Sequence, residues 1–447
     1  MIRTLAEAEA FLRTREDFER RAREGWRPDL APVRALLAAL GEPQRRYRTV
    51  HVGGTKGKGS TATFLAEILR AGGSRVGLYT SPHLERVTER IVVDGEEISG
   101  EAFAEAVGRA AAIVQAGGEA ARASTFDVLT ATAFGHFERT GVEWAVVEVG
   151  LGGRLDSTNV AEPEVCVLTN VSLEHTEVLG DRIEDIAREK AGIVKRGVPV
   201  VTGFEGEALS VLEEVCRGKG ARLLRKEEHF GVESIERVGP GLRVGLRTWG
   251  ARYGPVAVPG VGLYQAENLA FAVAAVEATR ERGTLARFDL EDALAAAAPR
   301  LRVPGRFEIL PGEPPVVLDG AHTPESVEAA LASLEGAFPG RRVAVVFAAQ
   351  REKDLRGMLS RLRDRADTVV LTSVDTPRAA SRFTLADAAR EIGLRFVEEE
   401  SPARALEAAA ARAGPDGVVL ALGSLYLVGA LRSPAAARGR RGRADRC

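Results

Sequence analysis

A glycine-rich segment near the N-terminus is the strongest chemical feature of the sequence. Residues 51–69 read HVGGTKGKGSTATFLAEIL, so an apolar run leads through four glycines into a predicted helix that opens with Ser and Thr. Glycines let backbone N–H groups approach phosphate oxygens, and a helix N-terminus favours negative charge. Lys58 can reach the outer phosphates. The segment predicts a binding site for a nucleoside triphosphate, and the alternative is a glycine turn that only connects the strand to the helix.

The glycine segment departs from the strict phosphate-loop pattern. Gly59 separates Lys58 from Ser60, so the usable form is Gly54-x-x-Gly57-Lys58-x-Ser60 rather than GxxxxGK[ST]. On motif grounds Ser60 is the hydroxyl that would bind a metal ion. The loop alone indicates a nucleotide but does not say which reaction uses it.

Three polar residues lie in or just after predicted strands and helices downstream of this loop. The predicted strand 143–150 contains Glu148 near its end, the strand 164–170 leads to His175, and Lys190 lies in the helical run 181–195. Carboxyl ends of parallel strands share one edge of a sheet, so Glu148 and His175 can both face the loop. Mg²⁺ takes few protein ligands, usually a carboxylate, a hydroxyl and waters, which makes Glu148 a candidate. The alternatives are a solvated Glu, a structural His and an exposed helical Lys.

The elements that must position these residues alternate regularly. From Tyr47, short β-branched runs alternate with Ala/Leu/Glu-rich helical runs, which predicts an α/β fold with a mainly parallel sheet. Alternating β-like segments occupy residues 226–258. The periodicity stops at APRLRVPGRFEIL, and a second α/β alternation begins beyond it. We therefore expect a nucleotide-binding domain over 1–303 and a smaller, Rossmann-like α/β domain over 304–432. The arginine-rich residues 433–447 lack apolar periodicity, and we expect them to be disordered.

The composition excludes several classes of protein. A chain of 447 residues exceeds one usual core, which supports two domains, and a net charge of -2 gives no sign of a nucleic-acid partner. The N-terminus mixes acids and bases without an apolar core, so we expect no signal peptide, and no apolar run is long enough for a bilayer. Cys166, Cys216 and Cys447 lie far apart, which favours neither disulfides nor a zinc site. We expect a cytoplasmic protein.

Several sequence blocks occur together in the order and spacing of one family. They are GTKGKGST, GLYTSPHLERVTERI, VVEVGLGGRLDSTN, LEHTEVLG, IAREKAGIVK, PGRFE, VLDGAHTP and GSLYLVG. With these blocks the chain resembles the folylpolyglutamate synthases, many of which are also dihydrofolate synthases, within the Mur ligase superfamily. The resemblance runs from about Val50 to Leu431. TSPHL, EVGLGGRLD and GSLYLVG separate the folate branch from the cell-wall ligases.

The resemblance implies the roles of individual residues. It places ATP contacts on Thr55, Lys56, Gly57, Lys58, Asn268, Arg306 and Asp319. It places magnesium on Ser81, in place of Ser60, together with Glu148 and His175. Lys190 matches a lysine that the family carries as a carbamate, which would hold a second Mg²⁺. His322 matches a histidine near the nucleotide and glutamate site, and we group it with Lys58 and Lys190 as catalytic. The pterin-bearing substrate would lie near Ser124, Phe126, Leu155, Asp156 and Ser157.

Four positions depart from the family pattern. Lys56 stands where Asn is usual, Glu174 where Asp precedes the histidine, Tyr264 where His commonly precedes Gln, and Thr323 where Asn follows the histidine. None removes a proposed ligand. Lys56 adds a cation that can strengthen ATP binding, or it faces solvent without effect. Thr323 puts one contact in doubt.

The implied activity is an ATP- and magnesium-dependent ligation of a folate-type carboxylate to L-glutamate through an acyl phosphate. Because Arg306 and Asp319 lie beyond the expected boundary, the active site should lie in the cleft between the domains. We expect a monomer that acts on small molecules, without nucleic-acid or membrane partners. Two alternatives stay open: a Mur-type ligase acting on another acid, and an ATP-binding regulator that has lost its chemistry. The sequence does not say whether dihydropteroate, tetrahydrofolate or both are used.

Overall fold

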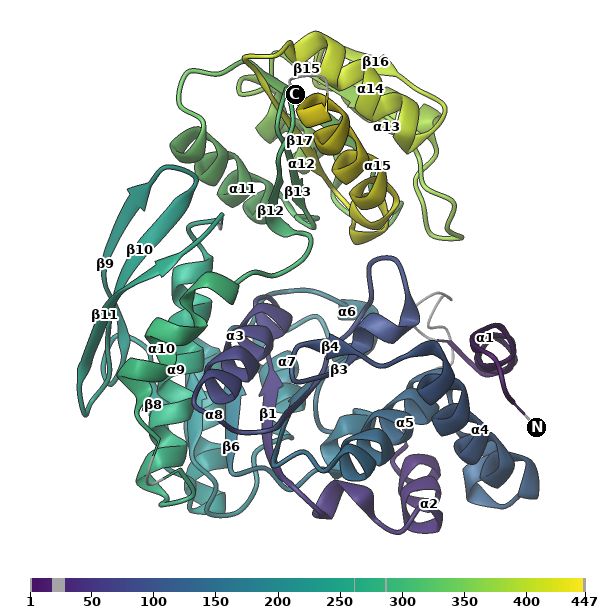
Figure 1. Ribbon diagram of the computed structural model, residues 1–447, viewed down its shortest axis with the longest axis vertical. Helices are drawn as coiled ribbons and strands as arrows, with labels where there is room; N and C mark the ends of the chain where they lie inside the picture. The colour runs from purple at the N-terminus through teal and green to yellow at the C-terminus, as the bar shows by residue number, and fades with distance from the viewer. Residues whose placement is uncertain (1, 18–28, 261, 286–287, 445–447) are drawn as a thin grey trace. The chain divides into compact units, whose positions relative to one another are not determined.

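The computed structural model describes residues 2–17, 29–260, 262–285 and 288–444. The chain divides into two compact units, each built from segments that are not contiguous in sequence (Figure 1). The first unit comprises Met1–Ser234, Val244–Val256 and Glu267–Leu301. The second comprises Ile235–Arg243, Ala257–Ala266 and Arg302–Cys447. Among the described residues we find no helix with the length and apolarity that crossing a bilayer requires.

The first unit is organised around a large sheet. In the described part of the chain this sheet has eight strands in the order β4-β3-β2-β5-β1-β6-β7-β8. The strands are β1 (Arg48–Gly53), β2 (Val76–Tyr79), β3 (Ile91–Val93), β4 (Glu96–Glu97), β5 (Trp144–Glu148), β6 (Val165–Leu168), β7 (Val200–Thr202) and β8 (Leu223–Arg225). Strands β2, β5, β1, β6, β7 and β8 pair in parallel, and β3 and β4 add an antiparallel edge beside β2.

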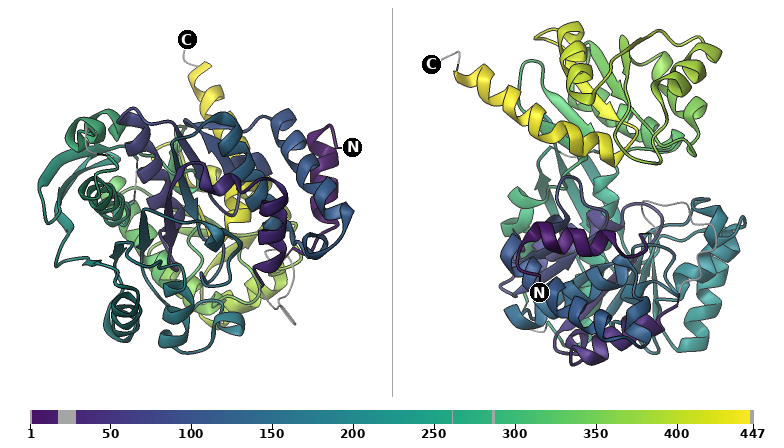
Figure 2. Two further views of the ribbon diagram at one scale, coloured as in Figure 1. Left: turned by 90° about the horizontal axis from the view of Figure 1, so that it is seen from below. Right: turned by 90° about the vertical axis from the view of Figure 1, so that its right-hand side faces the viewer.

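Helices cover both faces of this sheet, as Figures 1 and 2 show. The helices in this part of the chain are α1 (Leu5–Arg13), α2 (Ala31–Ala39), α3 (Lys58–Ala71), α4 (Gly100–Ala116), α5 (Thr125–Thr140), α6 (Thr176–Leu179), α7 (Ile183–Ala191), α8 (Gly206–Lys219), α9 (Gln265–Glu281) and α10 (Leu290–Ala297). Because both faces are covered, the central strands are buried along nearly their whole length and read as continuous apolar runs. Ala145 and Val147 of β5 pack in the cluster that holds α4 and α5.

The second unit contains a smaller sheet of the same type. Within the described residues it has six strands in the order β12-β13-β17-β14-β15-β16, of which β12 alone is antiparallel to its neighbour. The strands are β12 (Arg306–Leu310), β13 (Val316–Asp319), β14 (Val343–Phe347), β15 (Thr368–Leu371), β16 (Phe396–Glu398) and β17 (Val418–Leu422). The helices are α11 (Pro324–Ala337), α12 (Leu355–Arg363), α13 (Arg382–Glu391), α14 (Pro402–Ala413) and α15 (Leu425–Ala444).

A three-stranded sheet occupies the stretch where the sequence loses its α/β rhythm. Its strands β9 (Gly231–Val238), β10 (Gly241–Arg247) and β11 (Arg252–Val258) pair in the order β11-β10-β9 in the part of the chain that the structure describes. Residues of all three strands are divided between the two units. The β-like alternation expected for residues 226–258 corresponds to this sheet.

The mainly parallel α/β fold with a smaller second α/β domain is confirmed, whereas the C-terminal tail differs from our expectation. Residues 433–444, which we expected to be disordered, continue helix α15, and residues 445–447 lie outside the described residues. Ala and Arg are strong helix formers, and the first turn of this stretch is anchored because Ala435 is buried. Arg432 pairs with Glu308 of β12, which holds the helix just before the tail begins.

Candidate active site

The phosphate loop is held in shape by the segment that follows β6. The backbone N–H of Thr55 donates to the carbonyl oxygen of Asn170 at 2.9 Å, and that of Lys56 donates to Asn170 Oδ1 at 2.9 Å. In return, Asn170 Nδ2 and Thr169 Oγ1 donate to the Lys56 carbonyl at 3.0 and 2.7 Å. These bonds fix the backbone of the loop from outside it, which preorganises its N–H groups for an anion.

Two loop glycines are required by both conformation and space. Gly54 and Gly57 have φ angles of +136° and +83°, which side chains other than glycine rarely adopt. A side chain at Gly54 would collide with the Thr169 hydroxyl, and one at Gly57 would collide with the amide oxygen of Asn268 in α9. Asn268 is therefore placed directly against the loop, and its role as an ATP contact, which the family resemblance implies, stays a prediction.

Two lysines converge on the same loop. Lys58, the first residue of α3, donates from Nζ to the Thr55 carbonyl at 3.2 Å, and Lys190 of α7 donates from Nζ to the Gly54 carbonyl at 2.9 Å. Lys190 is only 4% exposed, so its reading as an exposed helical lysine is wrong. Burial, followed by repulsion from Lys58, lowers the pKa of Lys190 to about 7.

Glu148 lies at the same edge of the sheet. The parallel register pairs Val52 of β1 with Glu148, so the carboxylate lies beside the start of the loop. Glu148 is 4% exposed, and its Oε2 accepts the backbone N–H of Ser81 at 3.0 Å. A Cβ on Gly59 would lie 3.2 Å from the same oxygen. The structure thus brings Glu148, Ser81 and the first turn of α3 together.

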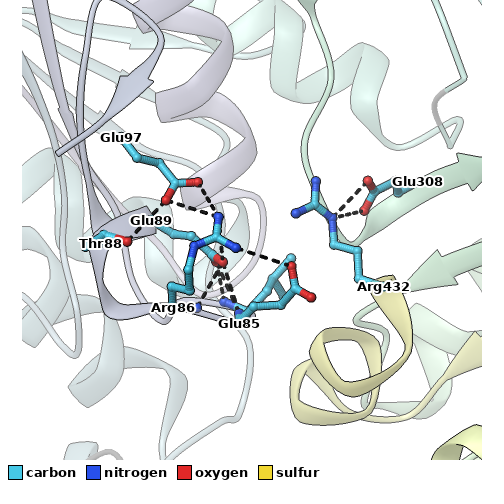
Figure 3. Close-up of polar contacts among 8 residues, drawn as sticks. Glu85, Arg86, Thr88, Glu89, Glu97, Glu308 and Arg432 are labelled. Atoms are coloured by element: carbon cyan, nitrogen blue, oxygen red, sulfur yellow. Dashed lines mark hydrogen bonds and ion pairs between the residues drawn. The ribbon is translucent and has the colours of Figure 1, made fainter. Parts of the chain in front are cut away.

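The turn after Ser81 is built around one carboxylate. Glu89 in the short helix η2 (Val87–Arg90) accepts the backbone N–H groups of Leu84, Glu85 and Arg86 at 2.8 to 3.1 Å. Arg86 continues outward to Glu97 of β4 at 2.9 Å (Figure 3). These contacts tie the loop that carries Ser81 to the antiparallel edge of the sheet.

His175 lies in the segment that follows β6. It precedes α6 as its N-cap residue and has a φ of 56°, in the left-handed region. Among the described residues, no three His, Cys, Asp or Glu side chains gather closely enough to hold a metal ion. The expected magnesium ligands are Ser81, Glu148, His175 and a modified Lys190. Only Glu148 and His175 belong to these four residue types, so the absence of a group of three does not test this ligand set. The role of His175 stays a prediction.

In the second unit, Arg306, Asp319 and His322 occupy neighbouring positions. Arg306 of β12 pairs in register with Asp319 at the end of β13, and Asp319 is 3% exposed. His322 donates from Nδ1 to the Gly320 carbonyl at 2.8 Å. Glu308 accepts the backbone N–H of Gly305 at 2.8 Å and also binds Arg432 (Figure 3). Thr323, a departure in the sequence, caps α11 by accepting from Ser326 N.

Comparison with known families and proteins decides the family. The Mur ligase middle domain matches residues 52–276, and the glutamate ligase domain of Mur ligases matches residues 305–425. A dihydrofolate synthase/folylpolyglutamate synthase of Bacillus subtilis is 34% identical over 416 residues, which cover 92% of this chain and 96% of the relative. The chain belongs to the dihydrofolate synthase/folylpolyglutamate synthase family. It is an ATP-dependent ligase.

Solved structures of this family share the whole fold. The chain is similar to folylpolyglutamate synthase of Mycobacterium tuberculosis complexed with ADP, with a TM-score of 0.87 and 32% identity over 96% of this chain and 98% of that one. It is also similar to an Escherichia coli enzyme in complex with DHPP and ADP, with a TM-score of 0.83 and 30% identity over 97% and 98% of the chains. The family predicted from the ordered sequence blocks is confirmed.

Three of the residues that the family resemblance gives to the acid substrate, Ser124, Asp156 and Ser157, take part in hydrogen bonds at buried or half-buried positions. Ser124 caps α5, and its hydroxyl donates to Asp127 Oδ2 at 2.7 Å. Ser157 donates to the other oxygen of Asp127 at 2.6 Å. Phe126 stacks on Tyr79 with ring centroids 6.0 Å apart. The structure therefore brings Ser124, Phe126 and Ser157 together, and one carboxylate fixes both hydroxyls.

A second group of hydrogen bonds links Asp156 to the strand that carries the phosphate loop. Asp156 Oδ1 accepts the Thr158 hydroxyl, and Thr158 Oγ1 accepts from Nε2 of His51 at 2.8 Å. Burial raises the pKa of Asp156 to about 6 and lowers that of His51 to about 3, so His51 is neutral. Within the described residues, His51 Nδ1 has no hydrogen-bond partner.

Sequence reasoning did not name Asp127, Asn170, Thr169, His51 or Thr158. Asp127 carries a weak signal, because Ser-x-x-Asp before an apolar run is a capping-box pattern. Asn170 and Thr169 end a predicted strand, and only the pairing of β1 with β6 places them beside the loop. His51 lies between Val50 and Val52 in a buried strand, and nothing in that pattern predicts that its ring makes a hydrogen bond.

Proposed function

We propose that this ligase joins L-glutamate to a folate-type acid, either dihydropteroate or tetrahydrofolate and its glutamate adducts, at the expense of ATP. The observation that best supports this proposal is the phosphate loop itself. Lys58 and Lys190 donate hydrogen bonds to its carbonyl oxygens, and Glu148 lies beside the helix that follows it. The names of the relatives support the choice of acid and of glutamate. ATP contacts are assigned to Thr55, Lys56, Gly57, Lys58, Asn268, Arg306 and Asp319.

The reaction has two steps. An oxygen of the substrate carboxylate forms a bond to the γ-phosphorus, the bond from that phosphorus to the bridging oxygen breaks, and ADP leaves. The neutral amine of glutamate then attacks the acyl carbon, phosphate leaves with the electrons of the carbon–oxygen bond, and the nitrogen loses a proton. Because carboxylate and phosphate are both anionic, Lys58 serves by neutralising the phosphate charge and the loop by orienting it.

The donors near the loop fit magnesium. A carboxylate from Glu148 and a hydroxyl from Ser81 are hard oxygen ligands of the kind Mg²⁺ takes beside ATP, and His175 completes the assigned set. When bound, the ion neutralises phosphate charge. Glu148 also accepts the backbone N–H of Ser81. This carboxylate would therefore serve as a ligand itself and also position the loop that carries the Ser81 hydroxyl.

Lys190 is assigned as a carbamate that serves a second Mg²⁺. Carbamate formation requires a neutral amine, which attacks the carbon of CO₂ and releases a proton. The lowered pKa of Lys190, caused by burial and by Lys58, leaves a large neutral fraction at neutral pH. The modification turns a cation into an anionic oxygen donor, which removes the repulsion between this side chain and Lys58. His322 is assigned near the nucleotide and glutamate.

The acid substrate is assigned to Ser124, Phe126, Leu155, Asp156 and Ser157. The polar network behind these residues supports the assignment, because Asp127 fixes two hydroxyls and Thr158 fixes the Asp156 carboxylate. Aromatic stacking between Phe126 and Tyr79 supplies a flat apolar neighbour. A partly buried array of this kind suits an aromatic ring system with several hydrogen-bonding groups.

A panel of acids tests the proposal. The enzyme is incubated with ATP, Mg²⁺, L-glutamate and one acid at a time, namely dihydropteroate, tetrahydrofolate or a muramoyl-peptide precursor, and products are identified by mass spectrometry. We expect a glutamyl adduct with at least one of the two folate-type acids and none with the cell-wall precursor. Ligation of the cell-wall precursor alone would assign the enzyme to another acid, and no ligation of any acid would support a silent nucleotide binder.

A further inference from the structure

Tyr264 makes a short hydrogen bond to a residue assigned to ATP. It directly precedes α9, and its hydroxyl donates to Asp319 Oδ2 at 2.5 Å. Both residues belong to the second unit. The sequence marks Tyr264 only as a departure from the histidine usual in the family, and no role follows from the sequence.

The bond completes the fixation of the Asp319 carboxylate. Oδ1 accepts the backbone N–H of Ala321 at 2.8 Å, and Oδ2 accepts the Tyr264 hydroxyl. Because each oxygen has its own donor, the plane of the carboxylate is set and cannot rotate without breaking a bond. Arg306 lies opposite Asp319 across the β12–β13 pair and contributes attraction.

Tyr264 is itself held from two sides, so it can act as a fixed point. The backbone N–H of the preceding Leu263 donates to Ser333 Oγ at 3.0 Å, and Ser333 donates onward to the Ala329 carbonyl within α11 at 2.7 Å. The phenol ring passes close to Gly262, where a Cβ would lie 2.7 Å from Cε1. The ring also packs on the apolar cluster of the second unit.

The pKa shifts of Tyr264 and Asp319 agree with a hydrogen bond in which the phenol donates and the carboxylate accepts. Burial, reinforced by the Asp319 charge, raises the pKa of Tyr264 well above its ordinary value, so the hydroxyl keeps its proton at neutral pH. Burial also raises the pKa of Asp319, while Tyr264 and Arg306 act in the opposite direction. The phenol thereby favours the ionised carboxylate in a place where burial disfavours it.

We propose that Tyr264 is a positioning residue for ATP, which acts by orienting the Asp319 carboxylate toward the nucleotide. The inference rests on the proposed function, which assigns Asp319 to ATP. Histidine does not replace tyrosine here, because the phenol oxygen lies farther from Cα than either imidazole nitrogen.

Steady-state kinetics of Tyr264→Phe test the proposal. The substitution keeps the ring and removes only the hydroxyl, so the fold should persist. We expect the KM for ATP to rise about tenfold with the KM for glutamate unchanged, and Tyr264→His to behave in the same way. Tyr253→Phe is the matched control, since Tyr253 is another buried tyrosine whose hydroxyl binds a carboxylate, that of Glu277, and neither residue is among those assigned to ATP. It should leave the KM for ATP unchanged.

A double-mutant cycle separates this inference from the assignment of Asp319. Asp319→Asn should raise the KM for ATP, and adding Tyr264→Phe should raise it little further, because both changes remove the same oriented carboxylate. Calorimetric titration with ADP repeats the comparison without turnover. If Asp319→Asn leaves ATP binding intact, the assignment of Asp319 fails and the inference with it. If Asp319→Asn weakens ATP binding while Tyr264→Phe does not, or if the two effects multiply, the inference alone is overturned.

Discussion

Lys190 illustrates what the sequence holds at the scale of single residues. A lysine in an Ala/Arg/Glu-rich helix ordinarily faces solvent, and only the family resemblance pointed elsewhere. The structure buries it and places Nζ on the Gly54 carbonyl. The contact depends on the packing of α7 near β1, which no local pattern encodes. Lys58 and Glu148, by contrast, are marked by a motif and by a strand end, and both were predicted from the residues themselves.

The carbamate assignment predicts a dependence of activity on CO₂ and pH. Because the pKa of Lys190 is lowered to about 7, its neutral fraction grows as pH rises from 6 to 8, and carbamate formation grows with it. In CO₂-free buffer we expect turnover to fall severalfold, and added bicarbonate to restore it more fully at pH 8 than at pH 6. Turnover that ignores CO₂ at every pH would contradict the assignment.

Substitutions of Lys190 sharpen this test. Lys190→Ala should be nearly inactive but partly rescued by acetate, which can supply an anionic oxygen in the vacated space. Lys190→Arg should stay inactive, because it keeps the charge and cannot form a carbamate. Lys219→Arg, a change of another partly buried lysine in α8, serves as the control and should keep full activity. Full activity of Lys190→Arg would show that the site needs a cation or nothing.

At the scale of elements, the phosphate loop is shaped by a segment far away in the sequence. The glycines predict that the loop approaches phosphate, but they do not say what holds it open. Asn170 and Thr169 do so because β6 pairs with β1 in a register that places Leu168 beside Gly53. Strand existence follows from the apolar runs, whereas strand order depends on how all the connections pack. The sequence alone therefore could not predict this clamp, by which we mean the hydrogen bonds that join Thr169 and Asn170 to the phosphate loop.

Loosening the clamp should weaken nucleotide binding without unfolding the enzyme. Asn170→Ala removes one donor and one acceptor from the backbone of Lys56, so we expect the KM for ATP to rise about tenfold. Thr169→Ser keeps the hydroxyl and should change little, while Thr169→Val should weaken ATP binding. Steady-state kinetics with a melting curve for each variant check this. An unchanged KM for ATP in a folded Asn170→Ala enzyme would show that the loop holds its own shape.

At the scale of the whole molecule, alternation of apolar runs was sufficient to predict two α/β domains. It was not sufficient to predict that residues 235–243 and 257–266 belong to the second unit, because that depends on packing between segments distant in sequence. The C-terminal helix was missed because helix propensity in an Ala/Arg-rich tail is weak evidence until a neighbour anchors it. The domain boundary near Pro304, the cleft between domains, the monomeric state and the cytoplasmic location stay predictions.

The most direct test of the account is the stoichiometry of ADP and amide product in one reaction mixture. With ATP, Mg²⁺, L-glutamate and the preferred folate-type acid, we predict equal amounts of ADP and glutamyl product, and neither when the acid is omitted. Lys58→Ala should abolish both while keeping its fold, since Lys58 neutralises phosphate charge and fills no core position. ADP release without ligated product, or normal release by Lys58→Ala, would contradict the claim that this phosphate loop drives an ATP-dependent ligation.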